Sequence, residues 1–448
     1  MPSDHPTPEP ILKRRLGMDT PAALAALGAL ALAPAIGMVV AGQASLVVGG
    51  VAAISLGLVL LWRPQWTAYL MVLGALFNTF FVDAGFALLG AGDLAVLVSL
   101  PIWLLHRLNH PRDLRLPRGW PLLVAYTLLA GASLLEGVAP EAGVRSYLRQ
   151  VTYVASLFAM ADLVRDTAQL RRIFLIFMVG GTFIAAHALA TWQGGRLEGI
   201  ADQPNLLAVL LAFCGVPTIG IILSAGPSVR RLVGIGGLMV MIVALIFTIS
   251  RGNYLGFGCA ALWWMRRYRR LIVVAALATV GIVAVLARDP ELAANITRRW
   301  QLEDVSVSQR IIVQENAIQT ILQNPLFGVG FGQFSELHRK VDVNAEVGRS
   351  AHNQYLGQLA ATGIPATLLL FWFIALQFVP LWQRAGPFAR LRPDEQWMVA
   401  VFQALAIYQT VSMVFRTALR QPEWLVLSLY CTILAIALAR PPADAPSA

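Results

Sequence analysis

Long apolar runs recur along this chain from Pro21 to Ala439, and they restrict the folds that it can adopt. A helix needs about 20 apolar residues to cross the ~30 Å hydrocarbon core of a bilayer, and runs of that length recur here. Because the runs are continuously apolar and do not alternate, they exclude a transmembrane β-barrel. Charged residues make up only 13% of the chain, whereas a soluble domain carries about 25%. We therefore expect an all-α polytopic membrane protein.

The spacing of the runs predicts about 12–14 transmembrane helices. The candidate spans are residues 21–40, 45–62, 67–84, 88–106, 119–138, 147–164, 171–192, 206–225, 231–249, 252–265, 270–287, 353–382, 396–415 and 421–439. We expect an N-terminal tail at residues 1–20, an N-terminal bundle of helices at 21–287 and a long loop at 288–351. C-terminal helices at 352–439 and a second tail at 440–448 are expected to follow. The first run resembles a secretory signal but continues to Val40, so we interpret it as an uncleaved span.

Positive charge is distributed unevenly between the two sides of the membrane. One set of loops, on the same side as Lys13, carries Arg107, Arg112, Arg115, Arg118, Arg165, Arg171, Arg172, Arg230, Arg231, Arg266, Arg267, Arg269, Arg270, Arg384, Arg390 and Arg392. Cytoplasmic loops are enriched in Lys and Arg, so we assign that side and both termini to the cytoplasm. The net charge of +10 then reflects orientation in the membrane and does not indicate a nucleic-acid partner.

The segment 288–351 is expected on the opposite side of the membrane. It is too polar to be embedded and too long to be a simple connector. Gln309–Gln323 has apolar residues at helical spacing, which predicts an amphipathic helix lying against the membrane or the mouth of the bundle. Its predicted apolar positions are Ile311, Ile312, Ala317, Ile318, Ile321 and Leu322. A glycine-rich turn, Pro325–Phe334, follows it.

Arginines also occur on the outer side, where the positive-inside tendency does not place them. They are Arg145, Arg149, Arg196, Arg251, Arg416 and Arg420. For any single one of these arginines, contact with phospholipid headgroups is as good an explanation as a role in a functional site. Together they have few partner carboxylates in the surrounding sequence, so a shared anionic ligand is the more economical explanation. Arginine binds phosphate bidentately, and its persistent charge can stabilise a pyrophosphate leaving group without a metal.

His352 lies where the long loop returns to a span, in Ala351-His352-Asn353-Gln354-Tyr355. A neutral imidazole at a water–membrane boundary suits a general base for a sugar hydroxyl, whereas a helix-capping role is the simpler explanation for this residue alone. The sequence contains no HExxH, CxxC or phosphate-loop motif, so we expect neither metal nor cofactor. The cysteines, Cys214, Cys259 and Cys431, all fall in apolar segments and are expected to pack as small hydrophobic residues.

Several short motifs follow one another along the chain. In order they are Arg196 with Gly199 and Pro204–Ala208, then Ser250-Arg251-Gly252, then Pro325–Gly330, then His352-Asn353 with Gly363. None is specific alone, but their order and their placement relative to the spans resemble the O-antigen ligase and polymerase superfamily, and the ligases most of all. The resemblance covers roughly Arg196 to Leu370, and the topology extends it across the chain.

This resemblance implies a metal-independent, inverting glycosyltransferase related to the GT-C group, in the bacterial inner membrane with its active site on the periplasmic side. The donor would be a glycan on undecaprenyl pyrophosphate, and the acceptor would be a hydroxyl of the lipid A–core oligosaccharide. Arg196 and Arg251 would hold the pyrophosphate, and His352 would deprotonate the acceptor. The other candidates for contact with pyrophosphate or acceptor are Arg145, Arg149, Arg416, Arg420, Gln309, Arg310, Asn353 and Tyr355.

Three other functions remain open at this point. An O-antigen polymerase would use the same donor but extend another lipid-linked glycan. A protein O-oligosaccharyltransferase would transfer the glycan to a hydroxyl of a protein. A secondary transporter would also have many spans, but it predicts paired ionisable residues near the middle of the bilayer and repeat symmetry, whereas the notable charges here lie at outer helix ends.

Overall fold

The computed structural model describes residues 57–78, 81–83, 88–111, 114–137, 139–201, 203–269, 305–341, 350–416 and 421–441, together with residues 280, 287, 288, 290, 294 and 297. The predicted span 21–40 lies outside the described residues, as do most of the spans 45–62 and 270–287. Each of the other predicted spans overlaps a described helix.

The described part of the chain is dominated by helices. The α-helices are α4 (Trp66–Leu76), α5 (Ala91–Asn109), α6 (Trp120–Ala132), α7 (Pro140–Leu163), α8 (Thr167–Ala190), α9 (Pro204–Ser224), α10 (Val229–Phe247), α11 (Arg251–Arg267), α14 (Val305–Gln323), α15 (Phe334–Val341), α16 (Gln354–Phe378), α17 (Gln396–Ser412) and α18 (Gln421–Leu438). The short 3-10 helices are η2 (Ser133–Glu136), η3 (Gly199–Ala201), η4 (Val379–Trp382), η5 (Pro387–Arg390) and η6 (Pro393–Glu395).

The helical polytopic fold predicted from the apolar runs is confirmed. Among the described residues, 5 helices are long and apolar enough to cross a membrane: Ala91–Asn109, Thr167–Ala190, Pro204–Ser224, Val229–Phe247 and Gln354–Trp382. Shorter apolar helices accompany them at Trp66–Leu76, Trp120–Glu136 and Pro422–Leu438. The predicted total of about 12–14 spans stays a prediction.

A short β-hairpin replaces part of two predicted helical spans. The strands β1 (Phe81–Asp83) and β2 (Leu88–Gly90) pair antiparallel, so α4 ends earlier than predicted and α5 begins later. Asn78 explains the break, because its side-chain oxygen accepts a hydrogen bond from the backbone of Gly92 at 3.0 Å. A Cβ on Gly90 would stand 2.1 Å from that same Asn78 oxygen, so the hairpin needs glycine there. Such a hydrogen bond between a side chain and a distant backbone group cannot be predicted from hydrophobic runs alone.

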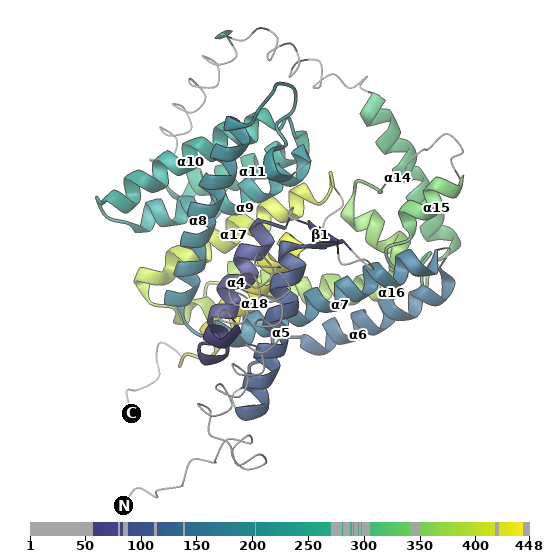
Figure 1. Ribbon diagram of the computed structural model, residues 1–448, viewed down its shortest axis with the longest axis horizontal. Coiled ribbons are helices and arrows are strands. Elements are labelled where there is room, and N and C mark those ends of the chain that lie inside the picture. Colours follow the sequence, from purple (N-terminus) through teal and green to yellow (C-terminus); the bar gives the residue numbers. More distant parts are fainter. Residues whose placement is uncertain are drawn as a thin grey trace, which may run out of the picture.

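The helices pack in two groups, and α4 and α18 contact both of them (Figure 1). In one group α9 packs against α8, α10 and α17, and α11 packs against α17. Nearly all side chains of α9 are buried, which fits its uniformly apolar sequence. In the other group α16 packs against α6, and α7 packs against α5 and α18. The helices α14 and α15 lie beside α16, at one end of the structure.

The predicted amphipathic helix is present as α14, and part of its apolar surface packs on the bundle. Val313 and Ala317 are buried in a small core with Val329, Phe334, Ala351 and Ala360. Of the other predicted apolar positions, Ile311, Ile312, Ile318 and Leu322 are exposed. The helix therefore packs on the bundle with a stripe of smaller side chains, and its larger apolar residues face outward.

The glycine-rich turn after α14 lies directly on the backbone of α16. Val329 N donates to Ala360 O at 2.9 Å, and Ile364 N donates to Pro325 O at 2.8 Å. Gly363 has φ +74° and interrupts the helical backbone of α16 at this contact. A Cβ on Gly363 would stand 2.2 Å from Leu326 O. Glycine is thus required where the two backbones meet.

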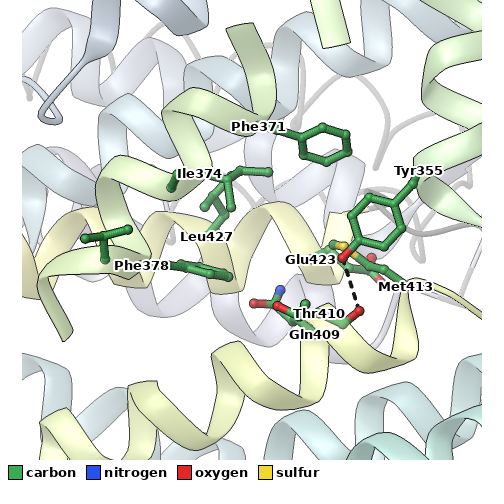
Figure 2. A pocket seen from close by; sticks show the side chains of 11 residues that line it. Tyr355, Phe371, Ile374, Phe378, Gln409, Thr410, Met413, Glu423 and Leu427 are labelled. Carbon is green, nitrogen blue, oxygen red and sulfur yellow. Dashed lines mark hydrogen bonds between the residues drawn. The ribbon is translucent and has the colours of Figure 1, made fainter. Parts of the chain in front are cut away.

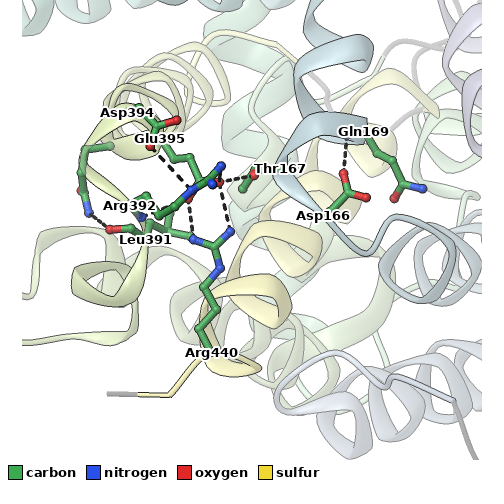
Figure 3. A network of polar contacts seen from close by, with 9 residues as sticks. Asp166, Thr167, Gln169, Leu391, Arg392, Asp394, Glu395 and Arg440 are labelled. Carbon is green, nitrogen blue, oxygen red and sulfur yellow. Dashed lines mark hydrogen bonds and ion pairs between the residues drawn. The ribbon is translucent and has the colours of Figure 1, made fainter. Parts of the chain in front are cut away.

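A buried carboxylate connects three segments on the side predicted to be cytoplasmic. Glu395, at the end of η6, is 3% exposed and pairs with Arg440, which follows α18. Arg392 Nη2 donates to Glu395 Oε1 at 3.0 Å, and the hydroxyl of Thr167, at the start of α8, donates to the same oxygen (Figure 3). The hydrogen bond from Arg440 is the main cause that lowers the pKa of Glu395 to about 2.

Replacing Glu395 with glutamine is expected to destabilise the protein at neutral pH. Removing one partner of a buried ion pair typically costs about 3–5 kcal/mol. Because the pKa of Glu395 is lowered from 4.5 to about 2, its contribution is complete above pH 4.5 and is lost as the pH falls towards 2. The melting temperature of Glu395→Gln in detergent should therefore lie below the wild type at pH 7, and the difference should shrink below pH 4.5. Asp394→Asn, at an exposed partner of Arg392, is the matched control and should change little.

Candidate functional site

Four arginines from separate parts of the chain line one small cavity. Its volume is about 80 Å³, and Arg196, Arg251, Arg310 and Arg416 all contribute to its wall. Arg196 precedes α9, Arg251 begins α11, Arg310 lies on α14 and Arg416 follows α17. None of the described residues that line this arginine cavity is acidic. The arrangement provides a concentrated positive surface of planar donors, which suits a doubly charged anion such as pyrophosphate.

Asn205 is the polar centre around which Arg196 and Ser250 are placed. Arg196 Nη2 donates to Asn205 Oδ1 at 3.0 Å, and its Nε donates to Thr248 O at 3.0 Å. Ser250 Oγ donates to the same Asn205 oxygen at 2.9 Å. The motifs around Arg196 and Arg251 are far apart in sequence, and Asn205 joins them in space. Only Pro204-Asn205, as part of the first motif, signalled this residue in the sequence.

A second asparagine extends this network to α17. Asn253 is 2% exposed, and its Nδ2 donates to Ser250 Oγ at 2.9 Å. Tyr408 on α17 donates its hydroxyl hydrogen to Asn253 Oδ1 at 2.5 Å. Neither Asn253 nor Tyr408 was selected from the sequence, because neither is charged and both lie in apolar spans. Together they hold the start of α11 against α17, and thus fix the position of Arg251.

Arg416 follows the end of α17 and is held from two sides. Its Nε and Nη2 donate to Ser412 Oγ at 3.4 and 3.3 Å, and its Nη1 pairs with Glu423. Glu423 lies on α18, with its side chain 2% exposed, whereas the Arg416 side chain is 12% exposed. A buried carboxylate paired with arginine fixes the guanidinium in place. Arg416 was predicted from the sequence as a site residue, whereas its partner Glu423 was not.

Left-handed backbone marks two positions beside candidate residues. Among the described residues, the non-glycine positions with positive φ are Ile249 and His352, both at +49°. For a β-branched residue such as Ile249 this conformation is strained. Ile249 lies two residues before Arg251, and His352 is itself the predicted base. Strained backbone of this kind gathers at functional sites, where the surrounding structure maintains it.

The segment containing His352 is anchored beside the arginine cavity. The side chain of Asn353 caps α16, accepting from Tyr355 N at 3.0 Å and from Leu356 N at 3.2 Å. Gln354 N donates to Met413 O at 2.8 Å, at the end of α17. Met413 directly follows Ser412, which lines the arginine cavity. His352 is half-buried, and it is not among the described residues that line the cavity.

An apolar groove begins at the same end of α17 and α18. Its volume is about 300 Å³, and it runs between α16, α17 and α18 (Figure 2). Phe371, Phe378 and Leu427 line it, together with Tyr355, whose hydroxyl donates to Thr410 O at 3.1 Å. Glu423 also lines this groove and pairs with Arg416. The groove therefore adjoins the arginine cavity through this ion pair.

The other predicted site residues lie elsewhere or outside the described structure. Arg145 has a side chain that is 66% exposed, and it pairs with Glu141 within α7 at 4.0 Å. Arg149 pairs at 3.6 Å with Asp93 at the start of α5. Arg420 lies outside the described residues, and so does the side chain of Gln309, although its backbone belongs to α14. Among the predicted outer arginines, the structure thus brings Arg196, Arg251 and Arg416 together.

Within the part of the chain that the structure describes, no group of three or more His, Cys, Asp or Glu side chains is placed to hold a metal ion.

Comparisons with known proteins agree with the resemblance seen in the sequence. Residues 236–371 match the family described as O-antigen ligase. This range contains Arg251, the glycine-rich turn, His352 and Gly363. A search of curated proteins finds no match. One similar solved chain comes from a peptidoglycan synthase complex, with 15% sequence identity and a TM-score of 0.36, covering 71% of this chain and 95% of that chain.

Proposed function

We propose that this protein is a glycosyltransferase of the O-antigen ligase type. It moves a glycan from undecaprenyl pyrophosphate to a hydroxyl of the lipid A–core oligosaccharide, on the periplasmic face of the bacterial inner membrane. The observation that carries the proposal is the convergence of Arg196, Arg251, Arg310 and Arg416 on one cavity. The match of residues 236–371 to the O-antigen ligase family supports it.

The arginine cavity would bind the pyrophosphate of the donor. Its guanidinium groups offer bidentate hydrogen bonds to phosphate oxygens, and their charge persists at all physiological pH values. When the bond between sugar and pyrophosphate breaks, negative charge develops on the leaving oxygen. Fixed positive groups stabilise that charge more in the transition state than in the ground state, which lowers the barrier. This electrostatic role requires no metal ion.

The apolar groove would hold part of the polyprenyl tail. It is lined mainly by aromatic and aliphatic side chains, and it adjoins the arginine cavity at the pair formed by Glu423 and Arg416. A lipid pyrophosphate has the same order of features, a charged group joined to a long hydrocarbon. Because the tail already lies in hydrocarbon within the bilayer, the groove would contribute packing contacts and would orient the donor, and it would not gain the energy of transfer from water.

His352 would activate the acceptor. In the proposed reaction its imidazole removes the proton from an acceptor hydroxyl, whose oxygen attacks the anomeric carbon from the face opposite the pyrophosphate. The bond to the pyrophosphate breaks, and the anomeric configuration inverts. The anchoring of residues 352–354 against the end of α17 supports this role, because it keeps the histidine near the arginines.

Reconstitution tests the proposal directly. The purified full chain in liposomes is supplied with glycan on undecaprenyl pyrophosphate and with lipid A–core, with and without a chelator. We expect glycan attached to lipid A–core at equal rates in both conditions. Growth of the lipid-linked glycan without transfer to lipid A–core would instead identify a polymerase. Transfer to a protein hydroxyl would identify a protein O-oligosaccharyltransferase, and uptake of labelled glycan without a new glycosidic bond would identify a transporter.

His352→Ala is expected to lower the rate of transfer by about 10²–10⁴-fold, which is the usual contribution of a general base. Donor affinity should change little, because the arginine cavity is intact. The measurement is the initial rate in the reconstituted assay, combined with binding of the lipid-linked donor. His110→Ala, an exposed histidine after α5, is the control and should retain wild-type rates. A His352→Ala protein that transfers normally contradicts the assignment.

A further inference from the structure

A second cavity lies between α6, α7, α16 and the segment that begins α15. Its volume is about 150 Å³. The side chains of Tyr126, Gln150, Gln354 and Gln358 line it, together with the aromatic rings of Phe331 and Phe334. We call it the amide cavity. A six-membered ring such as benzene occupies a cavity of about 150 Å³, so the amide cavity has room for a single ring.

The glutamines of the amide cavity are buried and connected. Gln354 and Gln358 are 4% and 6% exposed. Gln354 Nε2 donates to Gln358 Oε1 at 3.2 Å, and Gln358 Nε2 donates to the hydroxyl oxygen of Tyr126 at 3.2 Å. Polar side chains are rarely buried in a membrane protein without a function, because each must find a partner there. These contacts hold the amides of α16 in fixed orientations along one wall.

Gln150, on α7, lines the same cavity, and its side-chain amide nitrogen makes no hydrogen bond to the described residues. The residue is 5% exposed, and its Nε2 has no hydrogen-bond partner among the described residues. A buried amide group without a partner is costly, and native structures seldom keep one without a reason. Because Gln150 lines the amide cavity, a hydroxyl oxygen of a bound molecule would satisfy this donor.

The two cavities differ in charge. The arginine cavity is lined by four guanidinium groups, whereas none of the described residues that line the amide cavity is charged. Amides and hydroxyls recognise neutral hydroxyl groups through paired donors and acceptors, and aromatic rings contact the apolar faces of a ring. A molecule that combines a single ring with several neutral hydroxyls matches this lining.

We propose that the amide cavity binds one uncharged sugar ring of the glycan substrates. Its place in the fold supports this assignment, because Ala351 lines the amide cavity and immediately precedes His352. Gln354 lines it too, and its backbone N is bonded to Met413 O beside the arginine cavity. The sugar ring and the pyrophosphate would thus bind at neighbouring sites joined by residues 351–354. The inference rests on the proposed function only for the source of the sugar.

A binding measurement tests the inference without requiring transfer activity. The full chain in detergent is mixed with either the lipid-free core oligosaccharide or the lipid-free repeat-unit glycan, and saturation-transfer NMR records binding of each. We expect at least one of the two to bind, and the one that binds identifies the source as acceptor or donor. Gln150→Leu should weaken that binding by about 2- to 10-fold, which is the effect of one neutral hydrogen bond. Its melting temperature should not fall, because the Nε2 of Gln150 has no partner to lose among the described residues.

Gly357→Leu provides a second test that does not depend on Gln150. A Cβ at Gly357 would meet only Ala351 Cβ, at 3.5 Å, and Gly357 lines the amide cavity, so a leucine there would fill it. Binding should be abolished. The matched control is Gly236→Leu on α10, where a Cβ would meet nothing within 4 Å, and it should bind normally. Absence of binding by the wild type, or wild-type binding by both variants, overturns the inference. Binding that persists while no transfer occurs would refute the proposed function alone.

Discussion

Arg251→Ala is expected to reduce glycan transfer by about 10²–10³-fold, the usual effect of removing one group that stabilises charge in a transition state. The cavity would keep Arg196, Arg310 and Arg416, so the donor should still bind. The loss should therefore fall mainly on kcat, because the missing charge acts most strongly on the leaving pyrophosphate. The measurement is transfer to lipid A–core at saturating donor in liposomes.

Arg251→Lys separates charge from geometry at this position. Lysine keeps the positive charge but lacks the planar fork, so we expect an activity between those of the wild type and Arg251→Ala. The control is Arg230→Ala, which removes an exposed arginine at the predicted cytoplasmic start of α10 and should leave transfer unchanged. Equal activity of Arg251→Ala and the wild type would remove the basis for a pyrophosphate site at the arginine cavity.

Gly363→Ala is expected to prevent the glycine-rich turn and α14 from packing on α16. The added Cβ would stand 2.2 Å from Leu326 O, and the residue would have to keep φ near +74°. A clash with backbone cannot be relieved by rotating a side chain, so the glycine-rich turn must move away. We expect a loss of several kcal/mol, at the upper end of single substitutions. Melting temperature and the fraction of monodisperse protein in detergent measure it.

Gly357→Ala is the matched control for this prediction, because it changes a glycine of the same helix. Its Cβ would meet only Ala351 Cβ at 3.5 Å, and alanine is favoured over glycine in a helix by about 1 kcal/mol. Stability should therefore be equal or slightly higher. If Gly363→Ala is as stable as Gly357→Ala, the contact between the glycine-rich turn and α16 is not needed for folding.

The helices of this protein could be predicted from the sequence because hydrophobic runs are local signals. The amphipathic character of α14 was also readable, but the sequence does not tell which of its apolar residues face the bundle. Val313 and Ala317 are buried in the structure, whereas larger residues of the same helix such as Ile312 and Leu322 are exposed. The shape of the partner surface, which comes from residues far away in sequence, determines which face of such a helix packs.

The residues of the candidate site also fall into those that the sequence predicted and those that only the structure revealed. The sequence by itself singled out arginines on the predicted outer side of the membrane, which are costly to place there, and a histidine at the predicted membrane boundary. Only the tertiary structure decided which of them act together. Arg310 reaches the cavity because the glycine-rich turn seats α14 on α16, and Arg145 faces outward because its helix turns that side away. Glu423 and Gln150 were missed for the same physical reason: the importance of a neutral or paired side chain depends on its partners, and packing alone selects those partners.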